Sequence, residues 1–539
     1  MRRYSLFLAP MLLAIASNGL VTACSGDDNG GDAGDAASDA PIKKEASTLD
    51  VQQDTTPPVV VTPAGKQLYA SNLVQVFGVT TDNLVIFGDN GTDSSLYAAD
   101  ATGTNPPVKI ATPSVSASAT YIVGISGKVV FLWENVNPKA TQQIGKLSAW
   151  TSAGGLHQLT AASNAGSGFN SSTDGTKVMF SANATTTSAS GDIVGSAADG
   201  SAPSTLVTGV DISSGSCTPL FGFAGGVNPV VATCASDPGD GGTPVATVKS
   251  FNASTWAATA LSFSGLNFWS ATSAGDKLLV ASTTDLEVLN TDGTTIVPTI
   301  IDTKDINGGG FGYMEKDGQN VLYASAANAL YTSPTAVPLP VTLEASGVKY
   351  FRALSNDDKY ILYSSQLDSQ QFGSDIYLQS TSTAGKTTLV SGTTGALFGL
   401  LSTDNFTTDS KYALFIENVN TSTFTGDLMS VGVGGGTPVK LGSDEWLNLS
   451  ATGSKIVFND NCQGCGTNSA GAVIGVADIK SVDVSAATPT PTPLQAGADP
   501  QIYMAAPKDR VIFTYSQNVP SDDGGVSPAG NGLYSIAIP

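Results

Sequence analysis

Histidine is almost absent from this sequence, which has a single one, His157, in 539 residues. A Ser-His-Asp triad needs an imidazole base, and His157 lies in a Gly-Leu-His-Gln-Leu segment typical of an exposed outer strand. The nucleophile elbow Gly-x-Ser-x-Gly is also missing. The triple-glycine runs at 308–310 and 434–436 lack the lysine and helix start of a nucleotide cradle. No residue set points to catalysis, and we predict a protein that is not an enzyme.

Charge is scarce as well, because charged residues make up only 13% of the chain. Lys and Arg total 24 against 45 Asp and Glu, for a net charge of −21. Such an acidic chain repels phosphate backbones, so we expect no nucleic-acid partner. With 59 glycines and an abundance of Ser, Thr, Ala and Val, the composition is typical of short strands joined by tight turns. It predicts an all-β fold.

The N-terminus carries the sharpest local signal. Arg2 and Arg3 precede a mainly apolar run at 6–16, and small residues then lead to Cys24. The segment Val-Thr-Ala-Cys at 21–24 resembles the lipobox of bacterial lipoproteins, which implies a leader over 1–23 and a lipid on Cys24. Ser25 after the cysteine, by resemblance to Gram-negative sorting, favours the outer membrane. A plain secretory leader and an uncleaved membrane helix are the alternatives, although the apolar run is short for a span.

Residues 24–58 follow as an acidic stretch of Gly, Ala, Asp and Ser with almost no large apolar side chains. Such a segment cannot bury enough surface to offset its ordering entropy. We predict a disordered tether that joins the lipidated Cys24 to a body over 59–539. The expected location is the cell envelope, lipid-anchored, and either periplasmic or surface-exposed.

The other four cysteines fall into two local pairs. Cys217 and Cys234 bracket a predicted hairpin, and Cys462 and Cys465 lie in a Gly-rich loop. In an oxidising compartment we expect two disulfides. A metal or redox site is the alternative for Cys462 and Cys465, but zinc needs two more good ligands and the lone histidine is distant in sequence. Acidic clusters at 89–93, 237–240 and 522–523 match no calcium loop. We therefore predict no metal and no cofactor.

Beyond the tether, one unit recurs with a period of roughly 45 to 50 residues, in the range of solenoids and propellers. Each unit has an Asp-containing turn, a short apolar strand, a variable loop and a second strand that begins near an Asp. The four clearest copies lie at 173–180 with 191–194, 356–363 with 374–377, 408–415 with 426–428, and 451–458 with 477–479. Weaker copies centre on positions 82, 127, 225, 275, 317 and 509, which gives about ten units in all.

These residues resemble the TolB-type, or WD40-like (PD40), β-propeller repeat, in which a Ser-Pro-Asp-Gly-Lys-like turn precedes a buried strand. The resemblance spans most of residues 65–539 and implies four-stranded antiparallel blades. Thr, Asn or Lys mostly replaces the usual proline, so the chain is a divergent member. Ten blades suit either one large ring or two smaller rings. The last unit lacks an outer strand, and we expect residues 67–73 to complete it.

Two features are candidates for binding. The loops between the second and third strands are long in several units and would share one face, although simple tolerance of insertions explains the same lengths. Aromatic residues recur at the expected innermost strands, where they would either line a channel or pack between blades. The candidate channel aromatics are Trp269, Tyr313, Phe351, Phe398, Trp446 and Tyr503.

The recurring aspartates Asp192, Asp375, Asp427 and Asp478 occupy one position of the repeat, which indicates structural hydrogen bonding rather than four active sites. We therefore expect a protein-interaction or scaffolding platform whose partner is another envelope or extracellular protein. A glycan-binding module is the alternative. An enzyme using channel carboxylates is a third, less favoured possibility.

Overall fold

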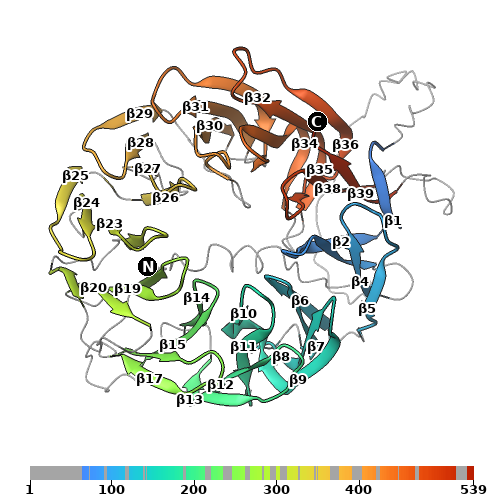
Figure 1. Cartoon of the computed structure of the whole chain (residues 1–539). Helices are drawn as coiled ribbons and strands as arrows, with labels where there is room; N and C mark the ends of the chain where they lie inside the picture. The colour runs from blue at the N-terminus through green and yellow to red at the C-terminus, as the bar shows by residue number, and fades with distance from the viewer. Residues whose placement is uncertain are drawn as a thin grey trace, which may run out of the picture.

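The computed structural model describes residues 63–539 except 72, 90–93, 114, 116–119, 138–139, 141, 186–189, 213–219, 235–245, 262–267, 282–284, 292–298, 304–311, 326–327, 345–347, 349, 365–374, 391–403, 421–424, 447, 468–472 and 517–530. The expected leader, Cys24 and the tether lie outside the described residues. Apart from the short 3-10 helix η2 (Ala165–Ser167), every regular element that the structure describes is a β-strand. The strands form ten antiparallel sheets arranged as one ring (Figure 1).

Each sheet is a blade whose first strand lies nearest the ring axis and whose last strand lies at the rim (Figure 1). Blades 1 to 3 contain β2 (Val74–Val79), β3 (Leu84–Asp89), β4 (Ser95–Asp100), β5 (Val108–Ala111); β6 (Thr120–Ser126), β7 (Val129–Val136), β8 (Ile144–Thr151), β9 (Gly155–Asn164); and β10 (Phe169–Ser171), β11 (Lys177–Ala182), β12 (Ser190–Ala197), β13 (Ser204–Asp211). Blades 4 to 6 contain β14 (Leu220–Ala224), β15 (Asn228–Cys234), β16 (Ala246–Phe251), β17 (Ala258–Leu261); β18 (Phe268–Ala271), β19 (Lys277–Ala281), β20 (Leu286–Asn290), β21 (Thr299–Asp302); and β22 (Gly312–Met314), β23 (Asn320–Ala324), β24 (Leu330–Pro334), β25 (Val341–Glu344).

Blades 7 to 10 complete the ring. They contain β26 (Tyr350–Leu354), β27 (Tyr360–Ser364), β28 (Ile376–Ser380), β29 (Lys386–Val390); β30 (Tyr412–Asn420), β31 (Thr425–Gly432), β32 (Val439–Glu445); β33 (Asn448–Ser450), β34 (Lys455–Thr467), β35 (Val473–Asp483), β36 (Thr492–Ala498); and β37 (Ile502–Met504), β38 (Arg510–Tyr515), β39 (Gly532–Ala537), β1 (Lys66–Ala70). In blade 8 an isolated bridge between Phe406 and Ala413 marks the place of the first strand.

Blade 10 takes its outer strand from the other end of the described chain. β1 pairs antiparallel with β39, with Lys66 opposite Ser535 and Ala70 opposite Gly532. The strand expected at 67–73 thus exists as β1, displaced slightly toward the N-terminus. The protein is a ten-bladed β-propeller with a single ring, so the arrangement with two rings does not occur. Closure in this way removes the open sheet edges that a linear array would expose.

Hydrophobic clusters fill all ten junctions between neighbouring blades in the described ring. In β7, Val130 and Leu132 face blade 1, whereas Phe131 and Trp133 face blade 3. Successive strand residues point to opposite faces of a sheet, so the second strand of a blade is buried on both sides. This explains why the repeat contains continuous apolar runs instead of alternating ones. Each buried side chain of this size contributes about 1.5 to 3 kcal/mol.

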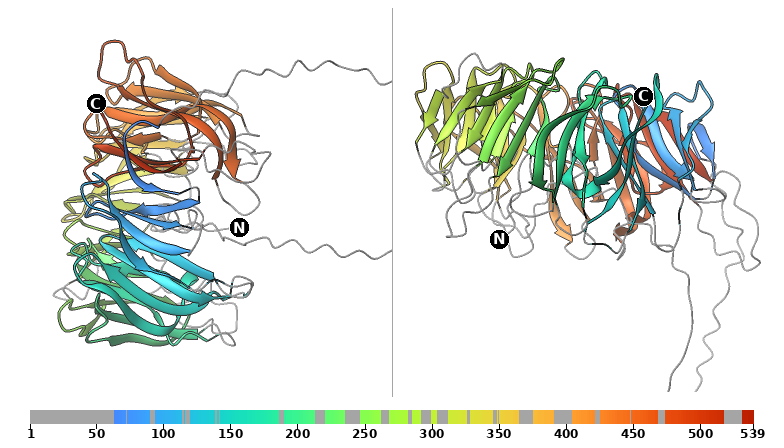
Figure 2. Two further views of the ribbon diagram at one scale, coloured as in Figure 1. Left: turned by 90° about the vertical axis from the view of Figure 1, so that its right-hand side faces the viewer. Right: turned by 90° about the horizontal axis from the view of Figure 1, so that it is seen from below.

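Hydrogen bonds join the turns between first and second strands along one face of the ring, which we call the turn face. The opposite face, where second strands connect to third strands, is the loop face. Figure 2 shows the strands running between these two faces. Backbone bonds from one turn to the next blade run from Thr81 to Gly127 (3.0 Å), Thr173 to Gly226 (2.9 Å), Ser273 to Lys316 (3.0 Å) and Thr452 to Lys508 (3.2 Å).

The recurring Asp-Gly-like turn is stabilised by the side-chain hydroxyl of the residue two positions before the aspartate. Ser172 Oγ donates to Asp174 Oδ1 (2.5 Å) and accepts from the Lys177 backbone N–H (3.0 Å). Gly175 between them has φ 73°, a left-handed conformation that favours glycine. The same hydroxyl-to-aspartate contact occurs at three other turns, between Thr80 and Asp82, Ser355 and Asp357, and Thr407 and Asp409. In blade 5 the Thr272 hydroxyl instead donates to Asp276, four residues further along the chain.

Candidate functional site

The loop face carries the features that distinguish one blade from another. The hairpin of β34 (13 residues) and β35 (11 residues) is much longer than that of β27 and β28 (5 residues each). Cys462 and Cys465 form a disulfide in this hairpin, with Cα atoms 5.7 Å apart. Cys465 is only 7% exposed and packs into the cluster between blades 9 and 10. The packing of Cys465 therefore holds this part of the hairpin against the ring, and the disulfide constrains the strand locally.

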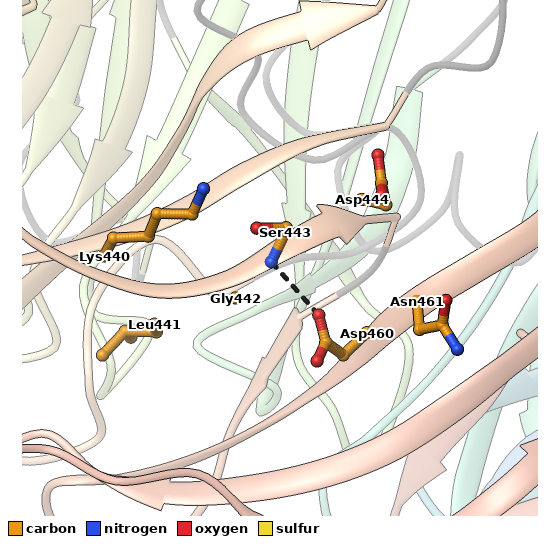
Figure 3. A pocket seen from close by; sticks show the side chains of 7 residues that line it. All are labelled: Lys440, Leu441, Gly442, Ser443, Asp444, Asp460 and Asn461. Carbon is orange, nitrogen blue, oxygen red and sulfur yellow. Dashed lines mark hydrogen bonds between the residues drawn. The ribbon is translucent and has the colours of Figure 1, made fainter.

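A shallow pocket lies between blades 8 and 9 on the same side of the ring (Figure 3). Ser443 at its centre donates its backbone N–H to Asp460 Oδ1 (3.1 Å). Asp460 also pairs with Lys480, and Lys440 pairs with Asp427 at 2.8 Å. The pocket thus offers hydrogen-bonding groups and two ion pairs, together with the carboxylate of Asp444. Its lining consists of Lys440, Leu441, Gly442, Ser443, Asp444, Asp460 and Asn461.

Glu445, the last residue of β32, lies next to this lining but is fully buried. Neither carboxylate oxygen has a hydrogen-bond partner among the described residues. Burial, and secondarily the charge of Asp460, raises the pKa of Glu445 well above its usual range, which favours the protonated carboxyl group. Asp302 ends the outer strand of blade 5 in the same way but accepts from Tyr323 of the next blade. In blade 9 the position of Tyr323 is taken by Phe458, which has no hydroxyl.

The sequence does not reveal this buried acid, because Ser-Asp-Glu before Trp446 looks like a solvated turn. The one available signal was comparison of repeats: the outer strands of blades 5 and 6 also end in acids, Asp302 and Glu344. Because Glu445 has no exposed surface, it cannot touch a ligand in the pocket directly. The buried carboxyl group of Glu445 therefore affects the stability of the folded ring and not the binding of a ligand.

Recurring aspartates at the start of third strands bind asparagines at the end of second strands. Asn183 Nδ2 donates to Asp192 Oδ2 (2.7 Å) and Asn418 Nδ2 to Asp427 Oδ2 (3.0 Å). Both asparagines adopt left-handed φ values, 52° and 54°. Asp375 instead accepts from its neighbour Tyr377 (3.4 Å). These contacts hold the hairpin bases in shape, which is the structural role expected from the repeat.

Three of the candidate channel aromatics have described side chains. Trp446 is 2% exposed and packs in the cluster between blades 9 and 10, so it serves packing and presents no ring face to a ligand. Tyr503 on β37 donates its hydroxyl to the Val76 carbonyl of blade 1 (3.1 Å), joining the last blade to the first. Tyr313 lies half-buried on β22, and burial raises its pKa to about 12.

The remaining sequence candidates cannot be placed. Trp269 and Phe351 belong to the innermost strands β18 and β26, but their side chains lie outside the described residues. Phe398, Cys24 and Cys217 also lie outside, as does the side chain of Cys234. The expected pairing of Cys217 with Cys234 therefore stays a prediction.

His157 lies on the outer strand β9, where a ring nitrogen is 2.7 Å from the Gly154 carbonyl oxygen. Within the described ranges, no group of three or more His, Cys, Asp and Glu side chains could hold a metal ion. The described part of the chain also has no helix of the length and hydropathy needed to cross a bilayer.

Comparisons with known proteins find similarity of fold only. No family model and no curated protein matches the chain. Among solved structures, a eukaryotic initiation factor is 13% identical with a TM-score of 0.45, over 70% of this chain and 89% of that chain. Dipeptidyl peptidase 4 from Porphyromonas gingivalis is 9% identical with a TM-score of 0.43, over 84% and 65%. TolB from Acinetobacter baumannii is 15% identical with a TM-score of 0.23, over 48% and 62%. The strand pairing, not these likenesses, defines the ring.

Proposed function

We propose that this protein is an exported lipoprotein, anchored in the cell envelope through Cys24, whose propeller is a non-enzymatic platform for another protein. The outer membrane is the favoured site. The partner binds on the loop face, where the β30–β31 and β34–β35 hairpins extend beyond their blades.

The direction of β1 is the observation that carries the proposal. β1 begins at Lys66, which packs against Gly103 in the turn between the third and fourth strands of blade 1, on the turn face. The strand then runs toward the loop face and ends at Ala70. The described chain therefore enters β1 from the side of the turn face, with the Ala64 N–H bonded to Gln495 of blade 9. We expect an anchor on the preceding residues to leave the loop face the more accessible of the two.

The two faces also differ in how freely they can vary. The turn face is tied from blade to blade by the hydrogen bonds described above, and a change there disturbs two blades at once. The loop face holds the long hairpins, which change in length from blade to blade without breaking the ring. Binding surfaces are commonly found on such variable loops carried by a rigid scaffold.

A photo-cross-linking residue tests the contact face in cells. Gln463 is exposed on the β34–β35 hairpin, between the two cysteines, and Thr490 is exposed on the turn face. We expect a discrete protein adduct from a cross-linker at position 463 and none from one at position 490. The absence of an adduct at position 463, or equal adducts from both positions, would contradict the proposal.

Cys24→Ala tests the anchor separately. The variant should lose incorporation of labelled fatty acid and move from the detergent phase to the aqueous phase on phase separation. Unchanged labelling would refute lipidation of Cys24 while leaving the loop-face proposal standing.

A further inference from the structure

Blade 6 exposes an apolar segment on the turn face, Val337-Pro-Leu339-Pro-Val341. Val337 is 76% exposed, Leu339 69% and Val341 50%, the first two being the highest values among the exposed large hydrophobic residues described. Isolated exposed hydrophobic residues are common on protein surfaces, whereas a run of them on one segment forms a candidate contact surface.

The two prolines give this segment its shape. Proline fixes its own φ and pushes the residue before it into an extended conformation. In an extended chain, residues two apart point to the same side, so Val337, Leu339 and Val341 form one stripe. Pro338 and Pro340 are half-buried between them. The stripe that faces solvent is therefore the apolar one, the reverse of the usual arrangement.

The segment is also held firmly in place. The Thr335 hydroxyl donates to the Gly318 carbonyl (2.6 Å), and its backbone N–H donates to Gln319 (2.9 Å). Both partners belong to the turn between β22 and β23, on the turn face. The Leu339 N–H donates to Ser333 Oγ (3.1 Å). The apolar stripe therefore cannot fold back onto the blade.

Blade 9 provides an internal comparison. Its corresponding segment is Thr488-Pro-Thr490-Pro-Thr492, which also leads into the outer strand and has the same alternation of exposed and half-buried residues. The fold therefore accepts threonine at all three exposed positions. The fold thus does not require Val337 and Leu339, whereas an exposed valine at the position of Val341 recurs at the start of β5 and β32.

We infer that the blade 6 stripe contacts the lipid bilayer and lays the turn face of the ring against it. The inference rests on the proposed anchoring. β1, where the tether joins, and β25, which follows the stripe, lie on opposite sides of the ring (Figure 1). A lipid anchor at one side and an apolar contact at the other would hold the ring flat. Residues 318–343 carry no charged side chain, but Lys277 Nζ donates to the same Gly318 carbonyl oxygen that Thr335 binds (3.3 Å), so only the protruding stripe and not the turn beneath it meets lipid.

The contact needs only modest strength. Three aliphatic side chains bury little area, but a tether raises their effective concentration at the membrane. The experiment therefore supplies a tether that does not depend on Cys24. A polyhistidine segment replaces residues 1–24, and the protein is held on phosphatidylcholine vesicles that contain a nickel-chelating lipid and brominated acyl chains.

Tryptophan fluorescence then reports contact with the acyl chains. We expect the added emission of Leu339→Trp, relative to the parent protein, to be quenched several-fold more than that of the control Gln463→Trp, which lies on the loop face. Val337→Trp, at another exposed position, should behave like Leu339→Trp. Equal quenching at positions 339 and 463, or none in blade 6, would overturn the inference. Either result leaves lipidation of Cys24 and the loop-face proposal untouched, since neither enters the measurement.

Discussion

Replacing Glu445 by glutamine should stabilise the protein by an amount that grows with pH. Glutamine has almost the same size and shape but no ionisable group. In the folded ring the pKa of Glu445 is raised well above its usual range by burial and then by Asp460, whereas the unfolded chain ionises it near pH 4.3. Above that pH, folding must return a proton to the carboxylate. The wild-type protein therefore loses about 1.4 kcal/mol for each pH unit between the unfolded and folded pKa values.

Below about pH 4.3 both states carry the proton and the variant gains nothing. Thermal unfolding of wild type and Glu445→Gln at pH 5, 6 and 7 checks this, and the difference in Tm should widen at each step. Asp444→Asn is the matched control: it removes the charge of the preceding, exposed residue, whose left-handed φ of 51° asparagine tolerates. A difference in Tm that stays constant with pH, or an equal gain in the control, would show that Glu445 is not protonated in the folded protein.

Three further sets of substitutions test the closure of the ring, the geometry of its turns and the role of the disulfide. Gly532→Ala should lower Tm by several degrees, because the added Cβ would lie 2.1 Å from the Tyr69 carbonyl oxygen where β1 closes the ring. The control Gly434→Ala should leave Tm unchanged, because a Cβ there meets no atom within 4 Å. Equal Tm values for the two variants would argue against closure by β1. Asp174→Ala should cost about 1 kcal/mol at pH 7, the usual value of a capping hydrogen bond. The pKa of Asp174 is lowered by its bonds to Ser172 and Thr176, so this difference should shrink as the pH falls below 4, and denaturation that shows no such convergence would contradict the turn geometry. The double change Cys462→Ser and Cys465→Ser should speed amide exchange in the β34–β35 hairpin with little effect on Tm, because the disulfide closes a very short loop; a large fall in Tm would show that it supports the whole ring.

Repetition made the architecture predictable from the sequence. A turn such as Asp174-Gly175 followed by the apolar run Val178 to Phe180 recurs often enough to indicate ten equivalent sheets, and the structure has ten. The short final unit also indicated that a strand near Gln67 was needed. Ring number could not be derived, because the angle between neighbouring blades depends on side-chain packing that no local pattern encodes.

The site was far less predictable. The hydroxyl at Ser172 that shapes the turn is invisible without its contacts, and the stripe at Val337 becomes meaningful only once its exposure is known. Trp446 looked like a channel residue because position along a strand does not reveal which cluster a ring enters. Interactions between neighbouring blades, such as that of Glu445 with Asp460, cannot be predicted by comparing the sequences of single repeats.

The orientation of the ring relative to the membrane is the central claim of this account. An electron cryo-microscopy map of the full lipidated protein in a lipid nanodisc measures it directly. We expect a single closed ring of ten blades with the turn face, including Leu339, against the bilayer and the β34–β35 hairpin pointing away. A ring with the hairpin toward the lipid, or one standing on its rim, would contradict the account.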